Sequence, residues 1–263
     1  MEARVPSEVT GISVILITKN EAHNIADCLR SVDFADEIIV VDSRSQDGTI
    51  EIAEAAGARV VVCDDWPGFG VQKNRALDLA TQPWVFSIDA DERVSPQLRD
   101  EILRTVRAPA MSAYRVPRLS EFCGKPIRHS GWWPDYVVRL FRRDAARFTE
   151  VVVHERVQTS GPVGTLDACL LHYPYRDLDA LIAKTNRYSS DAARAMAARG
   201  KTVGIAGVVG HSVWTFIRIY FLRRGFLDGR HGFVLAAMAA AGSFSRYAKL
   251  MFINAGSAER RDR

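Results

Sequence analysis

Four short runs rich in Val, Ile and Phe alternate with helix-periodic segments through the first hundred residues, and this alternation constrains the fold more than any other feature. The runs are as apolar as strands that are covered on both faces; they are residues 12–18, 37–42, 58–63 and 84–91. After the first run, apolar residues recur at the spacing of one helix face: Ile25, Cys28, Leu29 and Val32. Two further helices are expected at residues 47–57 and 70–80. Strands alternating with such helices predict an α/β fold with a mostly parallel sheet flanked by helices.

Polar residues follow these strands at their carboxyl ends, the edge at which open parallel sheets bind ligands. They are Thr18, Asn20 and Glu21 after the first strand, Asp42, Ser43 and Ser45 after the second, and Asp89 and Asp91 at the fourth. The first turn contains neither GxGxxG nor GxxxxGK[ST]. The dinucleotide and P-loop modes of holding phosphate therefore both lack their glycines.

The segment Asp89-Ala90-Asp91-Glu92 supports two interpretations. Its carboxylates can hold Mg²⁺ or Mn²⁺, which takes one or two protein carboxylates and leaves its other positions to substrate phosphate and water. Alternatively, the segment is a solvated helix N-terminus, with Asp91 as the cap and Glu92 in the first turn. The local sequence favours neither.

In its order of motifs the chain resembles the family 2 glycosyltransferases of the GT-A fold, which is Rossmann-like. The stretches that carry the resemblance are "ISVILITKNEAHNIADCLRSV", "EIIVVDSRSQDGTIEIA", "GFGVQKNRALDLA" and "WVFSIDADE". The resemblance implies that Asp89 and Asp91 form a DxD motif, which helps to hold a divalent metal, Mn²⁺ or Mg²⁺, on the donor diphosphate. It also implies that His172 faces this metal, although a lone histidine is more often a packed residue. The remaining donor-binding residues implied by the resemblance are Thr18, Asn20, Glu21, Asp42, Ser43, Lys73 and Asn74.

Two later stretches, "IRHSGWWPDYVVRLFRRDAARFTEVVVHERV" and "LLHYPYRDLDALIAKTNRYS", resemble a subgroup of bacterial lipopolysaccharide core glucosyltransferases. This implies transfer of glucose from a nucleotide-sugar to the lipid-linked inner core, with a UDP-sugar as the preferred candidate donor. Three alternatives stay open. They are another cell-envelope glycan as product, a non-catalytic nucleotide-sugar or divalent-ion binding module, and a nucleotidyltransferase, although "TKNEAHN" is not the glycine-rich phosphate loop expected of the last.

An inverting sugar transferase needs a base that takes the proton of the acceptor hydroxyl. The sequence offers Asp135, Glu150 and Glu155. The resemblance favours Glu155, which stands where many relatives carry a catalytic acid of Glu-Asp type, although the pair here is His154-Glu155. Asp135 is the alternative base, and a strand-end glutamate paired with a nearby arginine is the structural interpretation of Glu155.

The segment "GWWPDY" is the candidate acceptor site. Trp132 and Trp133 are rings of the kind that stack on the apolar side of a sugar, and Asp135 follows them. Equally, one tryptophan is a candidate for the core. Three arginines follow, Arg139, Arg142 and Arg143; one is a candidate phosphate contact, although a solvated face is the simpler interpretation of the group.

The last 63 residues are basic, with ten Lys and Arg against three Asp and Glu, a net charge of about +7. Two apolar runs, residues 202–217 and 232–245, fall short of the 18 or more apolar residues of a spanning helix. Apolar faces flanked by arginines and aromatic residues are typical of helices that lie on an anionic bilayer, and a dimer-forming or domain-covering hairpin is the alternative. Nucleic acid is not expected as a partner, since no binding motif accompanies the charge.

We therefore predict a GT-A domain over residues 1–200, with a nucleotide-binding half near 10–110 and an acceptor half near 111–200. Residues 201–263 form a basic, helical, membrane-associating extension. The start of the chain lacks a secretory pattern, and the four scattered cysteines suit thiols in a reducing cytosol. The expected location is cytoplasmic, peripheral on the inner face of the cell membrane.

Overall fold

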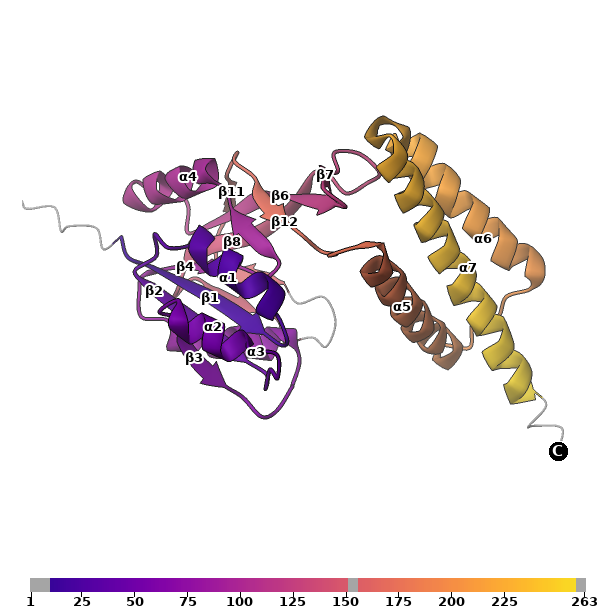
Figure 1. The fold of residues 1–263 in the computed structure, drawn as a ribbon, viewed down its shortest axis with the longest axis horizontal. Helices are drawn as coiled ribbons and strands as arrows, with labels where there is room; N and C mark the ends of the chain where they lie inside the picture. Colours follow the sequence, from indigo (N-terminus) through magenta and orange to yellow (C-terminus); the bar gives the residue numbers. More distant parts are fainter. Residues whose placement is uncertain (1–9, 151–155, 259–263) are drawn as a thin grey trace, which may run out of the picture. The chain divides into compact units, whose positions relative to one another are not determined.

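The computed structural model describes residues 10–150 and 156–258, with side chains described as far as Ile253. The chain divides into two compact units, which are coloured along the sequence in Figure 1. The first contains the residues up to Arg118 together with Asp135–His172, and the second contains Leu119–Pro134 together with the residues from Tyr173 onward. This division differs from the predicted boundary after Gly200, because the helix that precedes Gly200 packs against the last helix of the chain.

The first half of the sheet in the first unit is parallel, as predicted. Strand β1 (Ile12–Thr18) pairs with β2 (Glu37–Asp42) and with β4 (Trp84–Ser87), and β2 pairs with β3 (Arg59–Val62). The connecting helices are α1 (Ala22–Ser31), α2 (Thr49–Ala55) and α3 (Phe69–Leu79). The predicted α/β fold with a sheet flanked by helices is confirmed.

The rest of the sheet is mixed. Strand β8 (Asp135–Arg142) runs antiparallel to β4 and to β6 (Ala113–Phe122), and β5 (Glu92–Val94) runs antiparallel to β12 (Leu170–His172). The strand order is β3-β2-β1-β4-β8-β6-β12-β5. Helix α4 (Pro96–Arg107) follows β5, and the shorter strands are β7 (Lys125–Pro126), β9 (Ala146–Phe148), β10 (Val157–Thr159) and β11 (Val163–Thr165).

Strand β1 shows why the first apolar run is unbroken. Its alternate residues Ile12, Val14 and Leu16 belong to a core cluster with Ile25 and Leu29 of α1. Ile15 on the opposite side belongs to a second cluster that contains Ala76 and Leu77 of α3. Both faces of the strand are therefore buried beneath helices, so the run is almost wholly apolar, and its one polar residue before Thr18, Ser13, is hydrogen-bonded to Glu37.

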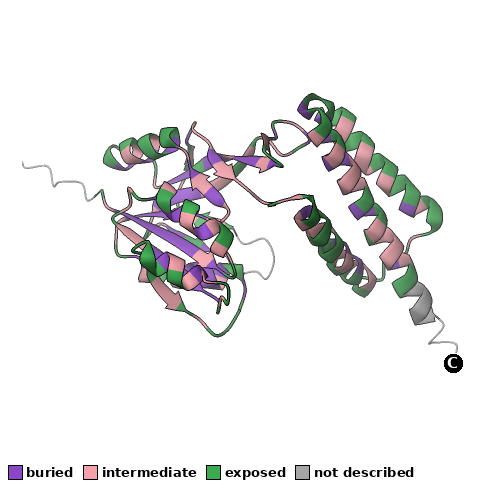
Figure 2. Ribbon diagram, viewed as in Figure 1, coloured by how far each residue is buried: buried purple, intermediate pink, exposed green. Residues whose placement is uncertain are grey.

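Three long helices lie in the described part of the second unit. They are α5 (Leu178–Ala198), α6 (Ile205–Ile217), which continues as a π-helical turn over Arg218–Leu222, and α7 (Arg230–Ala258). A 3₁₀ turn, Gly225–Asp228, precedes α7, and α7 packs against both α5 and α6. The buried core here is small, with Phe122, Ile127, Leu181 and Leu235 at its centre. Figure 2 shows exposed and half-buried residues along most of these helices.

The helix that starts at Ile205 is longer than the sequence indicated. The segment Ile205–Leu222 has 18 residues, a mean hydropathy of 1.4 and only 6% of its residues buried, so by length and composition it is apolar enough to cross a membrane. The prediction that neither apolar run reaches this length was wrong for this run, because the helix continues through Ile219, Tyr220, Phe221 and Leu222.

Candidate functional site

Asp42 lies fully buried where β2 ends and is oriented from two sides. Thr18 Oγ1, at the end of β1, donates to Asp42 Oδ2 at 2.7 Å. Ser45 adds a backbone N–H bond to Oδ1 at 2.7 Å and a hydroxyl bond to Oδ2 at 2.6 Å. The parallel register that pairs Thr18 with Asp42 brings these groups together. The result is a fixed carboxylate at the carboxyl edge of the sheet.

The loop after β1 is tied to the loop after β2. Asn20, which has φ of 56°, donates its N–H to Ser45 Oγ at 2.7 Å and accepts from Gln46 N at 2.9 Å. Glu21 N donates to Thr49 Oγ1 at 2.8 Å. Burial raises the pKa of the Glu21 carboxyl; a hydrogen bond from Asn24 opposes the rise, and the nearby charge of Asp91 adds to it. The loops therefore form one preorganised wall beside Asp91.

Helix α3 contributes three buried polar side chains, Gln72, Lys73 and Asn74, and of these Lys73 contacts Asp89. Gln72 Nε2, which was not predicted, donates to Ser43 Oγ at 3.0 Å. Asn74 forms two bonds with the backbone of Phe148, at 3.0 and 2.9 Å, and so holds strand β9. Lys73 Nζ lies 3.0 Å from Asp89 Oδ1.

Asp89 is neutralised by two cations. Lys73 contacts its Oδ1, and Arg139 Nη2 contacts its Oδ2 at 2.5 Å. Burial alone would raise the pKa of Asp89, but the charges of Arg139 and Lys73 outweigh burial and hold this pKa well below its usual range. Because both carboxylate oxygens face cations, Asp89 is suited to shaping the turn rather than to being the main ligand of a metal.

Glu92 is fully buried and was not predicted as a site residue. Its Oε1 lies 2.5 Å from Arg139 Nη2 and 3.2 Å from Arg118 Nη1, and its Oε2 accepts from Asp89 N at 3.0 Å. The helix N-terminus interpretation of this segment is wrong, because Glu92 begins strand β5. Helix α4 starts later, at Pro96, where Ser95 Oγ accepts from Leu98 N.

Asp91 and His172 lie together. The register of β5 and β12 pairs His172 with Glu92, next to Asp91, and His172 Nε2 lies 3.4 Å from Asp91 Oδ2. A carboxylate and an imidazole suit Mn²⁺ or Mg²⁺, which leaves several positions to phosphate and water. In residues 10–150 and 156–258, no group of three or more His, Cys, Asp or Glu is arranged to hold an ion. The pair therefore fits a metal that shares its coordination with a substrate phosphate.

The predicted acceptor residues divide between the two units. Trp132 packs in the second unit against Phe122 and Tyr175, with ring centroids at 6.4 and 6.1 Å, and Arg128 lies over Trp133 at 5.7 Å. Asp135 begins β8 in the first unit and accepts two bonds from Arg118.

Of the candidate bases, Glu155 lies outside the described residues. Glu150 Oε1 is 3.5 Å from Asn74 Nδ2. Among the arginines, the solvated-face interpretation is wrong for Arg139, which is 5% exposed. Arg142 lies over the Trp84 ring, and Arg143 donates to Ala80 O.

Comparison with known proteins adds sequence and fold relatives. Residues 13–159 match the sequence model of a family described as glycosyl transferase family 2. An uncharacterized glycosyltransferase of Rickettsia felis is 34% identical over 254 residues, which cover 91% of this chain and 89% of the relative. The lipopolysaccharide core biosynthesis glycosyltransferase LpsC of Rhizobium meliloti is 31% identical over 256 residues, which cover 90% and 93%. S. aureus TarS in complex with UDP shares the fold, with a TM-score of 0.50 at 15% identity over 96% of this chain and 92% of that one.

Proposed function

Because the chain belongs to glycosyl transferase family 2, and is thus a glycosyltransferase, we propose that it transfers a sugar from a UDP-sugar to a lipid-linked saccharide with inversion of the anomeric centre. The observation that carries the proposal is the edge of the sheet, where a fixed carboxylate, Asp42, follows β2 and the Asp91–His172 pair stands at β5 and β12. The first suits a nucleoside hydroxyl or base, and the second suits a metal-bound diphosphate. The nucleotide UDP in the TarS complex supports a uridine donor.

In this proposal Asp91 and His172 hold the divalent metal. When bound, the metal supplies charge that stabilises the departing diphosphate. Asp89 supports the metal site indirectly. Its carboxylate contacts Lys73 and Arg139, and its N–H donates to Glu92, so the turn that carries Asp91 stays fixed. Thr18, Asn20, Glu21 and Ser43 complete the donor pocket, while Asn74 supports it through strand β9.

The acceptor we propose is the inner core of lipopolysaccharide, with glucose as the sugar. The name of the LpsC relative supports the acceptor class. Asp135 is proposed to contact the acceptor, with Trp132 and Trp133 in the segment before it, and Glu155 is proposed as the base.

We also propose that the second unit binds the inner face of the cell membrane. It holds seventeen Lys and Arg against seven Asp and Glu, and it exposes large apolar side chains such as Ile205 (73% exposed), Trp214 (54%) and Leu222 (63%). Exposed apolar surface on this scale favours a bilayer or a partner, and the charge favours an anionic bilayer.

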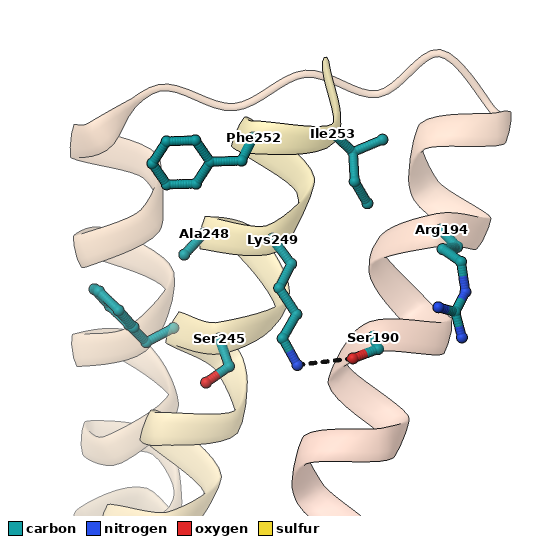
Figure 3. A pocket seen from close by; sticks show the side chains of 8 residues that line it. Ser190, Arg194, Ser245, Ala248, Lys249, Phe252 and Ile253 are labelled. Atoms are coloured by element: carbon teal, nitrogen blue, oxygen red, sulfur yellow. Dashed lines mark hydrogen bonds between the residues drawn. The ribbon is translucent and has the colours of Figure 1, made fainter. Parts of the chain in front are cut away.

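A pocket of about 630 Å³ between α5 and α7 is also lined by both basic and apolar side chains. Figure 3 shows Lys249 of α7 hydrogen-bonded to Ser190 of α5, with Arg194 on α5 and with Phe252 and Ile253 further along α7. Lys249 already donates to Asn186, Ser189 and Ser190, and Arg194 pairs with Asp191, so the pocket offers a lipid mainly its apolar side chains.

Transfer of a hexose from UDP-glucose to lipopolysaccharide truncated at its inner core, with Mn²⁺ or Mg²⁺ and anionic vesicles, tests the proposal. A product heavier by one hexose, formed only when metal is present, is expected. The absence of both transfer and hydrolysis with every member of a panel of UDP-, GDP- and dTDP-sugars would overturn it.

A further inference from the structure

Six side chains of alternating charge form a continuous chain of ion pairs through the first unit. In order they are Lys73, Asp89, Arg139, Glu92, Arg118 and Asp135, and the five contacts between neighbours measure 3.0, 2.5, 2.5, 3.2 and 2.6 Å. Three cations balance three anions. The chain runs from helix α3 on the donor side of the proposed site to the first residue of β8.

We infer that Arg118 is a positioning residue that sets the orientation of Asp135 toward the acceptor. Its Nε and Nη2 both donate to Asp135 Oδ2, at 2.9 and 2.6 Å. Its Nη1 donates to Glu92 Oε1 at 3.2 Å. The antiparallel register of β6 and β8 pairs Arg118 directly with Asp135, so the backbone places both groups.

Only a guanidinium serves both carboxylates in this way. The three nitrogens lie in one rigid plane, whereas a lysine ammonium is a single point charge on a flexible stem. Glu92, the anchor, has no freedom to move, since it is fully buried and also holds Arg139 and the N–H of Asp89. Arg118 therefore transmits the fixed position of Glu92 to Asp135.

The two ends of this arrangement differ in exposure. The Asp135 side chain is 41% exposed and so can be reached by a saccharide, whereas Arg118 is 22% exposed. The turn that carries Asp91 keeps its own supports when Arg118 is replaced, because Arg139 and Lys73 still hold Asp89. Replacing Arg118 should therefore disturb the acceptor and spare the donor. The inference rests on the proposed function.

The test compares Arg118→Lys with the wild-type chain, using UDP-glucose and lipopolysaccharide truncated at its inner core. A misplaced Asp135 is expected to raise the acceptor KM about 10- to 100-fold. The donor KM and the slow hydrolysis of UDP-glucose by water should stay within about twofold of wild type, because neither uses the acceptor. Arg115→Lys is the matched control, three residues earlier on β6, where the arginine side chain donates to Thr165 and lies over the ring of Tyr136; it should change none of these values.

Asp135→Asn, alone and combined with Arg118→Lys, tests whether Arg118 acts through Asp135. The single Asn variant should show the same rise in acceptor KM even if Arg118→Lys fails to fold, and the double variant should lose little more than either single one. Losses that multiply, or an equal fall in transfer and in UDP-glucose hydrolysis, would overturn the inference and leave the proposed function standing. A wild-type chain that neither transfers nor hydrolyses would overturn both.

Discussion

Replacing Arg139 with Met should destabilise the first unit more than any surface arginine can. Arg139 is 5% exposed and its Nη2 lies 2.5 Å from both Asp89 and Glu92. Met fills much of the same volume but removes one cation from a balanced set, so a buried negative charge is left over. Breaking a buried ion pair in this way costs about 3–5 kcal/mol. At about 2–4 °C per kcal/mol for a domain of this size, the melting temperature should fall by about 6–20 °C.

The loss should depend on pH. In the wild-type chain the pKa of Asp89 is lowered, so its contribution to stability is fully present above the unfolded value of about 3.9 and is lost as pH falls below it. Without Arg139, Asp89 loses one of the two charges that lower its pKa while the burial that raises it remains, so the ionisation of Asp89 would cost more stability as pH rises above about 4. Both effects make the deficit larger at pH 7 than at pH 4.

Urea unfolding of the wild-type chain and of Arg139→Met between pH 4 and pH 8 measures this deficit in the free energy of unfolding. Arg147→Met is the matched control, since Arg147 pairs with Asp78 at the surface and both side chains are more than half exposed. Such a pair contributes about 0–1 kcal/mol. If Arg139→Met loses no more than Arg147→Met, or loses the same amount at every pH, the buried chain of ion pairs does not stabilise the fold as argued.

Three further predictions follow from the proposed site and surface. Glu155→Gln should keep donor and metal binding but lower kcat by about 10² to 10⁴; if Asp135→Asn abolishes turnover while Glu155→Gln leaves it unchanged, the base is misassigned. Vesicles containing anionic lipid should sediment the wild-type chain at low salt and much less of it at high salt, and a variant with serine in place of Trp214 and Leu222 should sediment less; equal recovery of both chains contradicts membrane binding. Glu21→Gln should raise the melting temperature above pH 5 and have little effect below pH 4, because the raised pKa of Glu21 makes its ionisation costly in the folded state; a constant difference across this range contradicts that cause.

The strands of the parallel half could be predicted from the sequence because burial on both faces makes their residues mostly apolar, with polar exceptions such as Ser13 and Asp42 that are hydrogen-bonded. Residues 12–18 and 37–42 were predicted with the bounds that β1 and β2 have. The shorter strands escaped prediction for the opposite reason. Strands β5 and β12 have three residues each and exist because they pair with each other across a long stretch of sequence, which no local periodicity records.

The acids of the candidate site could be predicted from their place after strands, but their partners could not. Arg118 and Arg139 lie on β6 and β8 among apolar residues, where an arginine is indistinguishable in sequence from one on a solvated face. Their role becomes evident only in the structure, where buried Arg139 and partly buried Arg118 both face the fully buried Glu92. Asn74 shows the same limit, since its bonds go to the backbone of Phe148, far along the chain.

Calorimetric binding of UDP-glucose, with and without Mn²⁺, to the wild-type chain and to Asp91→Asn tests whether Asp91 holds a divalent metal for the donor. Metal should strengthen binding to the wild-type chain, and Asp91→Asn should remove this gain. The melting temperature of Asp91→Asn should stay close to wild type, because Asn has the size of Asp and its amide can still hydrogen-bond the neighbouring His172. Asp78→Asn, a surface control, should bind as the wild-type chain does. Metal-strengthened binding that persists unchanged in Asp91→Asn would show that Asp91 does not hold the metal.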